Sequence, residues 1–525
     1  MKVLSVYPCD VHFYFVIYYI IKINDVNKNR VTKIVKKLLA KIRMVCYNIR
    51  SKTGGKVMKK FIKILVLVFF IIVICFPKSM PNDVFWSIKT GDDLIHVGIK
   101  ETDDWSIHTG LRTVAHHYLF DILIYIIYSL CSFKGLFIFT IILTLIITGL
   151  LYLLNMEICK SSKLSYYYLY LQIIMLRPFI STRAHWLSII VFILEFMILE
   201  KITKKPTKMY YIILTVLPLV IMWIHMGVLP LYFIILGVYI VSNSLELKGQ
   251  VVTSRNIIIT RQLLIVMAIG IIEAFLNPYG IDGITYCTRT IFSDTIGNIT
   301  EFQPLNIATN YIGLLVFGHA LLIIIVLFVN KKIYLRDLLL ILGTFFMSLV
   351  SMRYILYYTV FSSVILRYIK EINLELKDTD KFVLNVSVWS VIGCLIVFLI
   401  PNMLCSGDYV NKSEYPVDAY NSVKDYITEE TRMFNDWNWG SYLALQGEKV
   451  FIDSRGDLYT EMYTKDVTIL KDYLNIELNY KEVIKKYNIN MFFVKANSPL
   501  STILSIDNDF APIYNDDVAC VYVKK

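Results

Sequence analysis

The chain has 525 residues, of which 56% are hydrophobic and 18% charged, and its mean hydropathy is +0.58. Soluble globular proteins are less apolar, so this composition excludes a soluble globule and predicts a protein with many membrane spans. The net charge of +12 arises mainly in residues 1–57, where twelve Lys and Arg face only Asp10 and Asp25. Because the remaining charge is nearly balanced, no nucleic-acid partner is predicted.

Residues 1–57 show no coherent hydrophobic period, whereas Met58-Lys59-Lys60 leads directly into an apolar run. A methionine followed by basic residues and an apolar run is typical of a bacterial N-terminus. We therefore expect translation to start at Met58, with residues 54–57 encoded by a ribosome-binding site. The alternative is a short hydrophobic anchor at residues 13–23 with a basic cytoplasmic tail.

Apolar runs long enough to cross a membrane recur through residues 58–405, and several are short for a span of about 20 residues. Short runs indicate tilted or kinked helices. The expected spans are 59–77, 135–154, 164–177, 186–200, 209–224, 228–242, 262–276, 311–330, 338–352, 354–366 and 382–404. They predict an all-α polytopic membrane domain of about eleven helices, within a range of about 10–13.

Basic segments indicate the orientation, because Lys and Arg accumulate in cytoplasmic loops. Six such segments alternate correctly with the expected spans if the N-terminus lies inside and the C-terminus outside. They are residues 59–60, 160–163, 201–208, 248–261, 331–336 and 367–381. The sequence therefore predicts a multi-pass protein of the cell membrane with its C-terminal part on the outer side.

The apolar segment 117–130 is left out of the helix count. It opens with His116-His117 and contains Asp121, which favours a helix that lies in the outer interface or dips back into the membrane, within an outer loop at 78–132. If this segment crossed the membrane, the basic residues 160–163 would move outside and break the charge rule.

From about Ser406 the composition changes to that of a soluble domain, with mixed charge and short β-rich runs. Strands are expected at 449–453, 491–495 and 519–523, and helices at 416–428 and 480–487. Residues 406–525 therefore predict a small extracytoplasmic α/β domain, which is long enough to form its own core.

The unusual polar residues of the apolar region fall almost entirely on the outer side in this topology. Ionisable groups at membrane depth are costly and mark functional sites, so their collection on one face predicts a single outward-facing cavity. They are Asp83, Asp103, Asp104, His116, His117, Asp121, Arg177, Arg183, His185, His225, Glu301 and Arg353, accompanied by Trp86, Asn277, Tyr279 and Gln303. Asp83 is the candidate catalytic residue, because a carboxylate just outside a membrane helix suits chemistry on a lipid-carried substrate.

The acidic residues also have a structural interpretation. Asp83 would then cap an interfacial helix that starts near Phe85. Asp103-Asp104, which precede Trp105-Ser106, fit a turn or a helix cap better than a metal-binding pair.

The basic residues divide in the same way. His116, His117 and His225 could be interfacial side chains with an apolar body and a hydrated tip. Arg177, Arg183 and Arg353 lie on the side that arginine disfavours, and a guanidinium there suits a phosphate or a carboxylate.

The order of these motifs resembles a group of bacterial membrane proteins related to the C superfamily of glycosyltransferases. The matching motifs are Asp83-x-x-Trp86, Thr90-Gly91, Gly98, Asp103-Asp104-Trp105-Ser106, His116-His117, Arg177-Pro178, Trp223-Ile224-His225-Met226-Gly227, Asn277-Pro278-Tyr279-Gly280, Glu301-Phe302-Gln303-Pro304 and Arg353. The resemblance covers most of the chain from Met58 to Lys525.

The resemblance implies that Asp83 is a general base or metal ligand and that the donor is a sugar on a polyprenyl phosphate or diphosphate. It implies that Arg177, Arg183, His225, Arg353, His116 and His117 bind the donor phosphate or the acceptor, and that Trp86, Asn277, Tyr279, Glu301 and Gln303 line the cavity. A divalent cation is a candidate cofactor, with oxygens from Asp83, Asp103 or Glu301. The expected partners are membrane lipid and the lipid-linked sugar.

A second similarity lies in the soluble region. Asn435-Asp436-Trp437-Asn438-Trp439-Gly440 followed by Asp453-Ser454-Arg455-Gly456 is similar to the Trp-Asp-Gly region of oligosaccharyltransferase C-terminal domains. The aspartate precedes the tryptophans here, so peptide recognition does not carry over. Trp437 and Trp439 are equally suited to packing the small domain onto the membrane region.

These observations favour a membrane glycosyltransferase that acts on the outer face. One alternative is a transporter or flippase of lipid-linked saccharides, which would be expected to show inverted repeats and charged residues on both faces. The other is a non-catalytic surface protein whose outer domain binds a partner.

Overall fold

The computed structural model describes residues 64, 67–71, 79–291, 303–306, 311–371, 409–461 and 467–525. The expected extension at 1–57, most of the first expected span, the last span at 382–404 and Glu301 lie outside these residues. The contacts reported below belong to one compact unit, which Ser79–Asn373 and Asp408–Lys525 form together.

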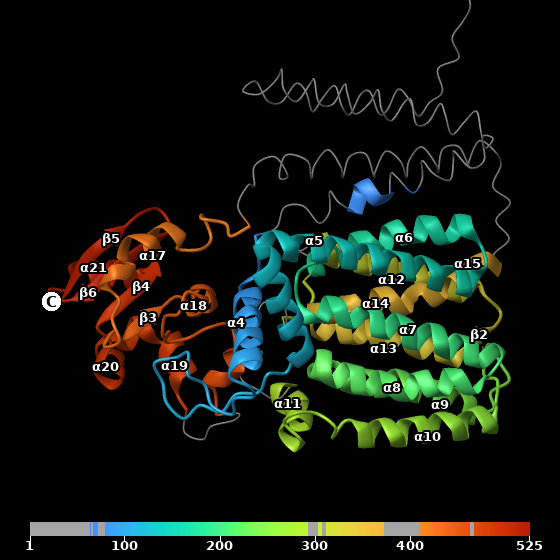
Figure 1. Cartoon of the computed structure of the whole chain (residues 1–525). Coiled ribbons are helices and arrows are strands. Elements are labelled where there is room, and N and C mark those ends of the chain that lie inside the picture. The colour runs from blue at the N-terminus through green and yellow to red at the C-terminus, as the bar shows by residue number, and fades with distance from the viewer. Residues whose placement is uncertain are drawn as a thin grey trace, which may run out of the picture. The chain divides into compact units, whose positions relative to one another are not determined.

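Helix α4 (Asn82–His96) packs on both the membrane region and the small domain, as Figure 1 shows. It buries Val84, Phe85, Trp86 and Ile88. At Gly91 the backbone passes so close to α5 that a Cβ atom would lie 2.1 Å from the carbonyl oxygen of Asp121. Only glycine permits this approach, which fixes α4 against the start of α5.

Helix α5 (Tyr118–Cys159) is interrupted at Ser132, where φ is 53° and ψ is −160°. This left-handed conformation is uncommon for a residue with a Cβ atom, and it divides the helix into an initial segment and a longer apolar one. The break falls between the expected interfacial segment 117–130 and the expected span 135–154. The initial segment packs against α4.

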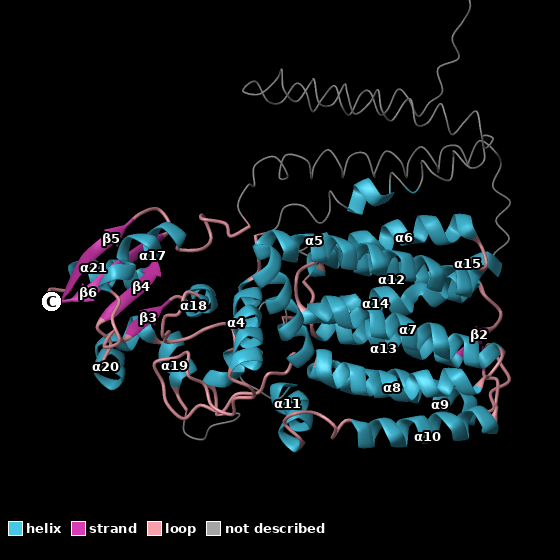
Figure 2. Cartoon of the chain, in the orientation of Figure 1, coloured by secondary structure: helices cyan, strands magenta, loops and turns pink. Residues whose placement is uncertain are grey.

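The remaining helices of the apolar region overlap the expected spans, including short ones, and run side by side in Figures 1 and 2. They are α6 (Ser162–Leu176), α7 (Ala184–Lys204), α8 (Lys208–Ile224), α9 (Leu229–Ser244), α10 (Ile257–Glu273), α12 (Tyr311–Val329), α13 (Leu335–Val350), α14 (Ile355–Phe361) and α15 (Ile365–Glu371), with α11 (Ile281–Ile291) between α10 and α12. Among the described residues, Tyr118–Cys159, Met226–Ser244 and Tyr311–Val329 are long and apolar enough to cross a membrane, and Lys208–Ile224 is a shorter apolar helix. The total of about eleven spans stays a prediction.

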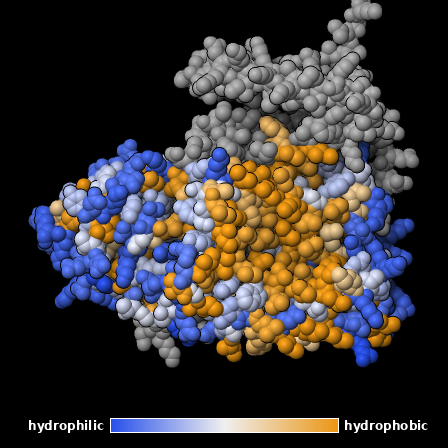
Figure 3. All heavy atoms as spheres, viewed as in Figure 1, coloured by the Kyte–Doolittle hydropathy of each residue, from blue (hydrophilic) through white to orange (hydrophobic). Residues whose placement is uncertain are grey.

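A broad hydrophobic surface covers this helical region, and hydrophilic surfaces border it at both ends in Figure 3. Large apolar side chains in it are strongly exposed, such as Phe328 at 85%, Ile258 at 74% and Val350 at 70%. Soluble proteins rarely expose a contiguous apolar surface of this kind. The surface is that of a protein embedded in lipid.

One end of the helical region holds a buried ionic cluster. Glu200 at the end of α7 accepts from Arg367 at 2.8 Å and lies 3.4 Å from Arg336, while Asp337 lies 3.1 Å from Arg367. Buried charges are tolerated when they are paired in this way. Two of the expected cytoplasmic segments, 331–336 and 367–381, contribute to the cluster. Strands β1 (Val251–Val252) and β2 (Ile333–Tyr334) also pair here, which places three expected cytoplasmic segments together.

The C-terminal region forms an α/β domain, as expected, and Figure 2 shows its strands. Its sheet has the order β3-β4-β6-β5, with β3 and β4 parallel and the other pairs antiparallel. The strands are β3 (Met433–Asn435), β4 (Met491–Lys495), β5 (Phe510–Asn515) and β6 (Ala519–Lys524), and the helices are α17 (Val417–Val423), α18 (Trp437–Leu445), α19 (Ile469–Leu474), α20 (Ile476–Tyr487) and α21 (Pro499–Ile506).

The expected strand at 449–453 is wrong. Val450 instead forms a single parallel bridge with Ser106, and its amide donates to the carbonyl of Trp105 at 3.0 Å. The apolar run Val450-Phe451-Ile452 is typical of a strand, but these residues are fully buried against the loop at 98–116 and take no place in the sheet.

Trp439 on α18 connects the small domain to the membrane region. Its ring is fully buried in a cluster that includes Phe85 of α4, and its Nε1 atom donates to the carbonyl of Glu414 at 2.8 Å. Trp437 packs instead on Tyr473, with ring centroids 5.9 Å apart. Of the two tryptophans, Trp439 therefore has the packing role that the sequence suggested.

Replacing Gly440 with alanine is expected to destabilise the protein by roughly 1–3 kcal/mol, since overpacking a tight contact forces the backbone to move. A Cβ atom at Gly440 would lie 1.9 Å from the carbonyl oxygen of Ile452. The thermal unfolding midpoint of detergent-purified Gly440→Ala should fall. Gly237→Ala is the control, because no atom lies within 4 Å of the added carbon. Equal midpoints for the two variants would contradict the packing assigned to Gly440.

Candidate active site

Asp83 and Arg183 form an ion pair at the end of the helical region opposite the Glu200 cluster. Asp83 lies in the first turn of α4, and Arg183 directly precedes α7. Their side chains retain 25% and 20% exposure, so both remain accessible. The helix starts at Asn82 with Pro81 as its N-cap residue, so the expected role of Asp83 as the cap of a helix starting near Phe85 is wrong.

A group of aromatic and imidazole rings lies beside this pair. Trp86, one turn after Asp83, stacks on His117 with centroids 5.5 Å apart and also lies 5.5 Å from His116. His117 in turn contacts His225 at 4.8 Å. The Nδ1 atom of His225 lies 3.1 Å from the hydroxyl of Ser188 on α7. Residues of α4, the first loop, α7 and the end of α8 therefore converge at one place.

Burial favours the neutral form of the two histidines of the first loop. Burial lowers the pKa of His116, although nearby Asp457 partly opposes this effect. Burial also lowers the pKa of His117, and the positive potential of His116, His225 and Arg353 adds to the effect. The Nδ1 atom of His117 is buried and has no hydrogen-bond partner among the described residues. A neutral imidazole of this kind can bind a polar group of a substrate.

Arg353 approaches the same cluster from another direction. It lies on the turn between α13 and α14 and acts electrostatically on His116, His117 and His225. The neighbouring amide of Met352 donates to the carbonyl of Gln303 at 3.1 Å. The structure therefore brings Arg353 and Gln303 to the end of the bundle that holds Asp83.

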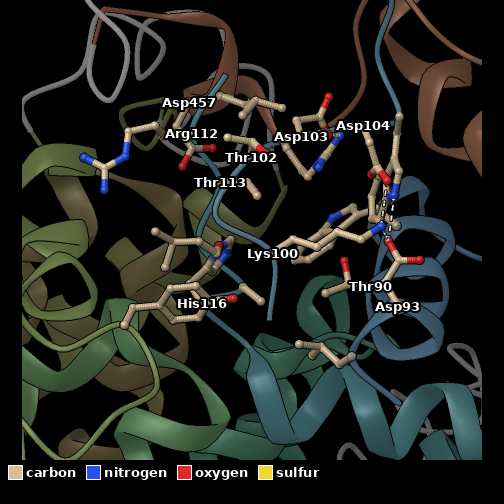
Figure 4. Close-up of a pocket in the computed structure, with 18 of the residues that line it drawn as sticks. Thr90, Asp93, Lys100, Thr102, Asp103, Asp104, Arg112, Thr113, His116 and Asp457 are labelled. Atoms are coloured by element: carbon tan, nitrogen blue, oxygen red, sulfur yellow. Dashed lines mark hydrogen bonds and ion pairs between the residues drawn. The ribbon is translucent and has the colours of Figure 1, made fainter. Parts of the chain in front are cut away.

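A pocket lies beside His116, and Figure 4 shows the residues that line it. Trp86, Thr90 and Asp93 of α4 form one side, and the loop at 98–116 forms another. Tyr279 and Tyr286 close it near His116, and residues 455–458 of the small domain complete it. In the figure, Lys100 binds Asp93 and Asp104 at one side of the pocket.

Arg455 of the small domain binds the loop at 98–116. Its guanidinium lies 2.8 Å from Asp103 and 2.6 Å from Asp453, and it covers the ring of Trp105 at 4.1 Å. Burial alone would raise the pKa of Asp103, but Arg455 and the amide of Ser106 together lower it below its ordinary value. The site therefore requires both the membrane region and the small domain.

No protein-family model and no curated protein sequence matches this chain. Solved structures do match it. The archaeal oligosaccharyltransferase AglB from Archaeoglobus fulgidus, in complex with an inhibitory peptide and a dolichol-phosphate, aligns with a TM-score of 0.50 and 12% identity over 83% of this chain and 70% of that chain. ArnT from Cupriavidus metallidurans, bound to undecaprenyl phosphate or in the apo state, aligns with a TM-score of 0.53 and 10% identity over 90% of this chain and 98% of that chain.

The chain shares its fold with AglB and ArnT. The described part of this chain is mostly helical, with a sheet near its C-terminus and apolar helices long enough to cross a membrane. The resemblance seen in the sequence motifs is confirmed at the level of the fold. At this low identity the alignment carries no residue roles.

Other residues that were expected in the site contact different parts of the structure. Arg177 donates to the hydroxyl of Tyr311 at 3.0 Å. The Nδ2 atom of Asn277 donates to the carbonyls of Ala274 and Gly280, so its side chain shapes a turn, whereas Tyr279 lines the pocket. Glu301 lies outside the described residues.

The carboxylates expected to hold a divalent cation have other partners in this fold. Asp83 pairs with Arg183 and Asp103 with Arg455. No group of three or more His, Cys, Asp or Glu side chains is placed to bind a metal ion within the described part of the chain. Glu301, the third candidate ligand, lies outside the described residues, so the divalent cation stays a prediction.

The role of Arg455 was not predicted from the sequence. The sequence displays the Asp103-Asp104 and Asp453-x-Arg455 motifs, but nothing in one sequence shows that segments so far apart meet. Their opposite charges were the only available signal.

Proposed function

We propose that the protein is a membrane glycosyltransferase that moves a sugar from a polyprenyl-phosphate donor to an acceptor on the outer face of the membrane. The superfamily fold supports the reaction class, and the two neighbours that bind dolichol-phosphate and undecaprenyl phosphate support the donor class. Asp83 acts as the general base, with the role of metal ligand as the alternative.

The observation that carries this proposal is the position of the Asp83–Arg183 pair beside His116 and His117, which are partly buried, and His225, which is buried. In the proposed step an acceptor oxygen or nitrogen forms a bond to the anomeric carbon of the sugar. The bond between that carbon and the phosphate oxygen breaks, and its electron pair stays on the lipid phosphate. Asp83 takes the proton that the acceptor loses.

The basic groups of the site have a matching role. The leaving lipid phosphate carries negative charge, which Arg183 and Arg353 stabilise while neutral histidines donate hydrogen bonds. When the phosphate attracts Arg183, the Asp83 carboxylate is released to act as a base. Because the basic segments collect at the opposite end of the helices, this reaction centre and the small domain face the outside.

The proposed reaction is tested with purified full-length protein in lipid vesicles that contain undecaprenyl-phosphate-linked hexoses or pentoses. The expected result is release of undecaprenyl phosphate that depends on the protein and on an added acceptor mixture from cell envelopes. Vesicles with undecaprenyl phosphate that carries no sugar serve as the blank. The absence of sugar transfer from every donor would contradict the proposed function.

A further inference from the structure

The pocket beside His116 adjoins the candidate reaction centre, because Trp86 and His116 belong to both. Asp83, Trp86, Thr90 and Asp93 follow one another at spacings of three and four residues on α4, which places them on the same side of the helix. The last three line the pocket. A ligand in the pocket would therefore extend toward Asp83, which lies one helical turn from Trp86.

The charges of the pocket wall neutralise one another. Lys100 lies 2.8 Å from both Asp93 and Asp104, and Arg455 lies 2.8 Å from Asp103. The third basic residue of the wall, Arg112, lies 3.0 Å from Asp282. With each cation already bound to a carboxylate, the wall does not favour a phosphate or another anion.

The groups that remain available are aromatic rings, hydroxyls and one carboxylate. Trp86 and Tyr286 are buried and stack on His117 and His116, so they close the inner end of the pocket, and the partly exposed ring of Tyr279 is the aromatic group available to a ligand. Thr90 and Thr113 contribute hydroxyls. The backbone carbonyl of Asp457 accepts from Thr460, whereas its carboxylate has no ion-pair or hydrogen-bond partner among the described residues and acts electrostatically on His116.

We propose that this pocket binds the acceptor of the transfer and that the acceptor is a neutral saccharide. Aromatic rings pack against the apolar faces of sugar rings, while hydroxyls and a carboxylate bind sugar hydroxyls. That the bound saccharide is the acceptor rests on the proposed function. Saccharide binding itself can be measured without any lipid donor. The sugar hydroxyl that reacts is the one at the end of the pocket nearest to Asp83.

The test uses detergent-purified full-length protein and ligand-observed saturation-transfer NMR with cellobiose, maltose, lactose and diacetylchitobiose, and with digalacturonate as an anionic comparison. At least one neutral disaccharide is expected to bind with a dissociation constant in about the millimolar range. Thr90→Trp, which fills the pocket, should weaken that binding by about tenfold or more. Ile95→Trp is the matched control on α4, because Ile95 is 45% exposed and does not line the pocket.

Three results would overturn the proposal: no binding of any neutral disaccharide, tighter binding of digalacturonate, or equal binding by Thr90→Trp and Ile95→Trp. Thermal unfolding of both variants shows whether Thr90→Trp is folded, and Thr90→Val offers a second variant that removes the hydroxyl without filling the pocket. If saccharide binding persists while the wild-type protein transfers no sugar from any donor, the proposed function fails and the saccharide site stands.

Discussion

Asp83→Asn is expected to slow sugar transfer by roughly 10²–10⁴-fold, the usual contribution of a positioned general base. Asparagine has nearly the same shape as aspartate but cannot take the acceptor proton at neutral pH. The measurement is the initial rate of undecaprenyl phosphate release in vesicles that contain equal amounts of folded wild-type and variant protein.

The control for this variant is Asp92→Asn on the same helix. Asp92 accepts from His96 at 2.8 Å and does not line the pocket, so its replacement should leave transfer unchanged. Arg183→Gln breaks the same ion pair but keeps the carboxylate, so a loss of transfer in this variant reports on the leaving phosphate and not on proton transfer. If Asp83→Asn transferred sugar at the wild-type rate, the role of Asp83 as the base would be lost.

Arg455→Met is expected to lower the free energy of unfolding by about 3–5 kcal/mol, because it leaves buried carboxylates without their cation. The side chains of Asp103 and Asp453 are 1% and 0% exposed, and Arg455 contacts both. Methionine keeps much of the apolar volume beside Trp105, so the effect reports mainly on charge. The thermal unfolding midpoint of the purified protein should fall sharply.

Arg112→Met is the matched control, since it removes the same charge from a pair whose arginine is 51% exposed. Exposed pairs contribute about 0–1 kcal/mol, so the midpoint should move little. Adding Asp103→Asn to Arg455→Met should recover part of the lost stability, because one uncompensated charge is removed. Similar midpoints for Arg455→Met and Arg112→Met would contradict the fastening role assigned to Arg455.

Much of the fold could be predicted from local patterns in the sequence. Apolar runs located the helices of the membrane region, and the break at Ser132 falls where His116-His117 and Asp121 had indicated a separate segment. Basic segments predicted which helix ends lie on the same side. In the structure, two of the expected cytoplasmic segments contribute to the Glu200 cluster. These features depend on hydrophobic period and charge, which a single chain displays directly.

The missed features depend on contacts between distant segments. The apolar run within residues 449–453 is typical of a strand, but its neighbour is the loop at 98–116 and not the sheet. The Arg455 contacts and the Asp83–Arg183 pair join residues whose partners no local pattern specifies. Asn277 was expected to line the cavity as part of the Asn277-Pro278-Tyr279-Gly280 motif in an outer loop, yet its side-chain amide forms hydrogen bonds within its own turn.

The central claim is that the end of the helices bearing Asp83 and Arg183 receives the phosphate of a polyprenyl donor. It is tested most directly by an experimental structure of the full-length protein in lipid with undecaprenyl phosphate bound. The phosphate is expected to lie within hydrogen-bond distance of Arg183 or Arg353, with Asp83 released from its arginine. A phosphate bound instead at the opposite end, beside Lys204 and Arg336, would contradict the proposed donor site.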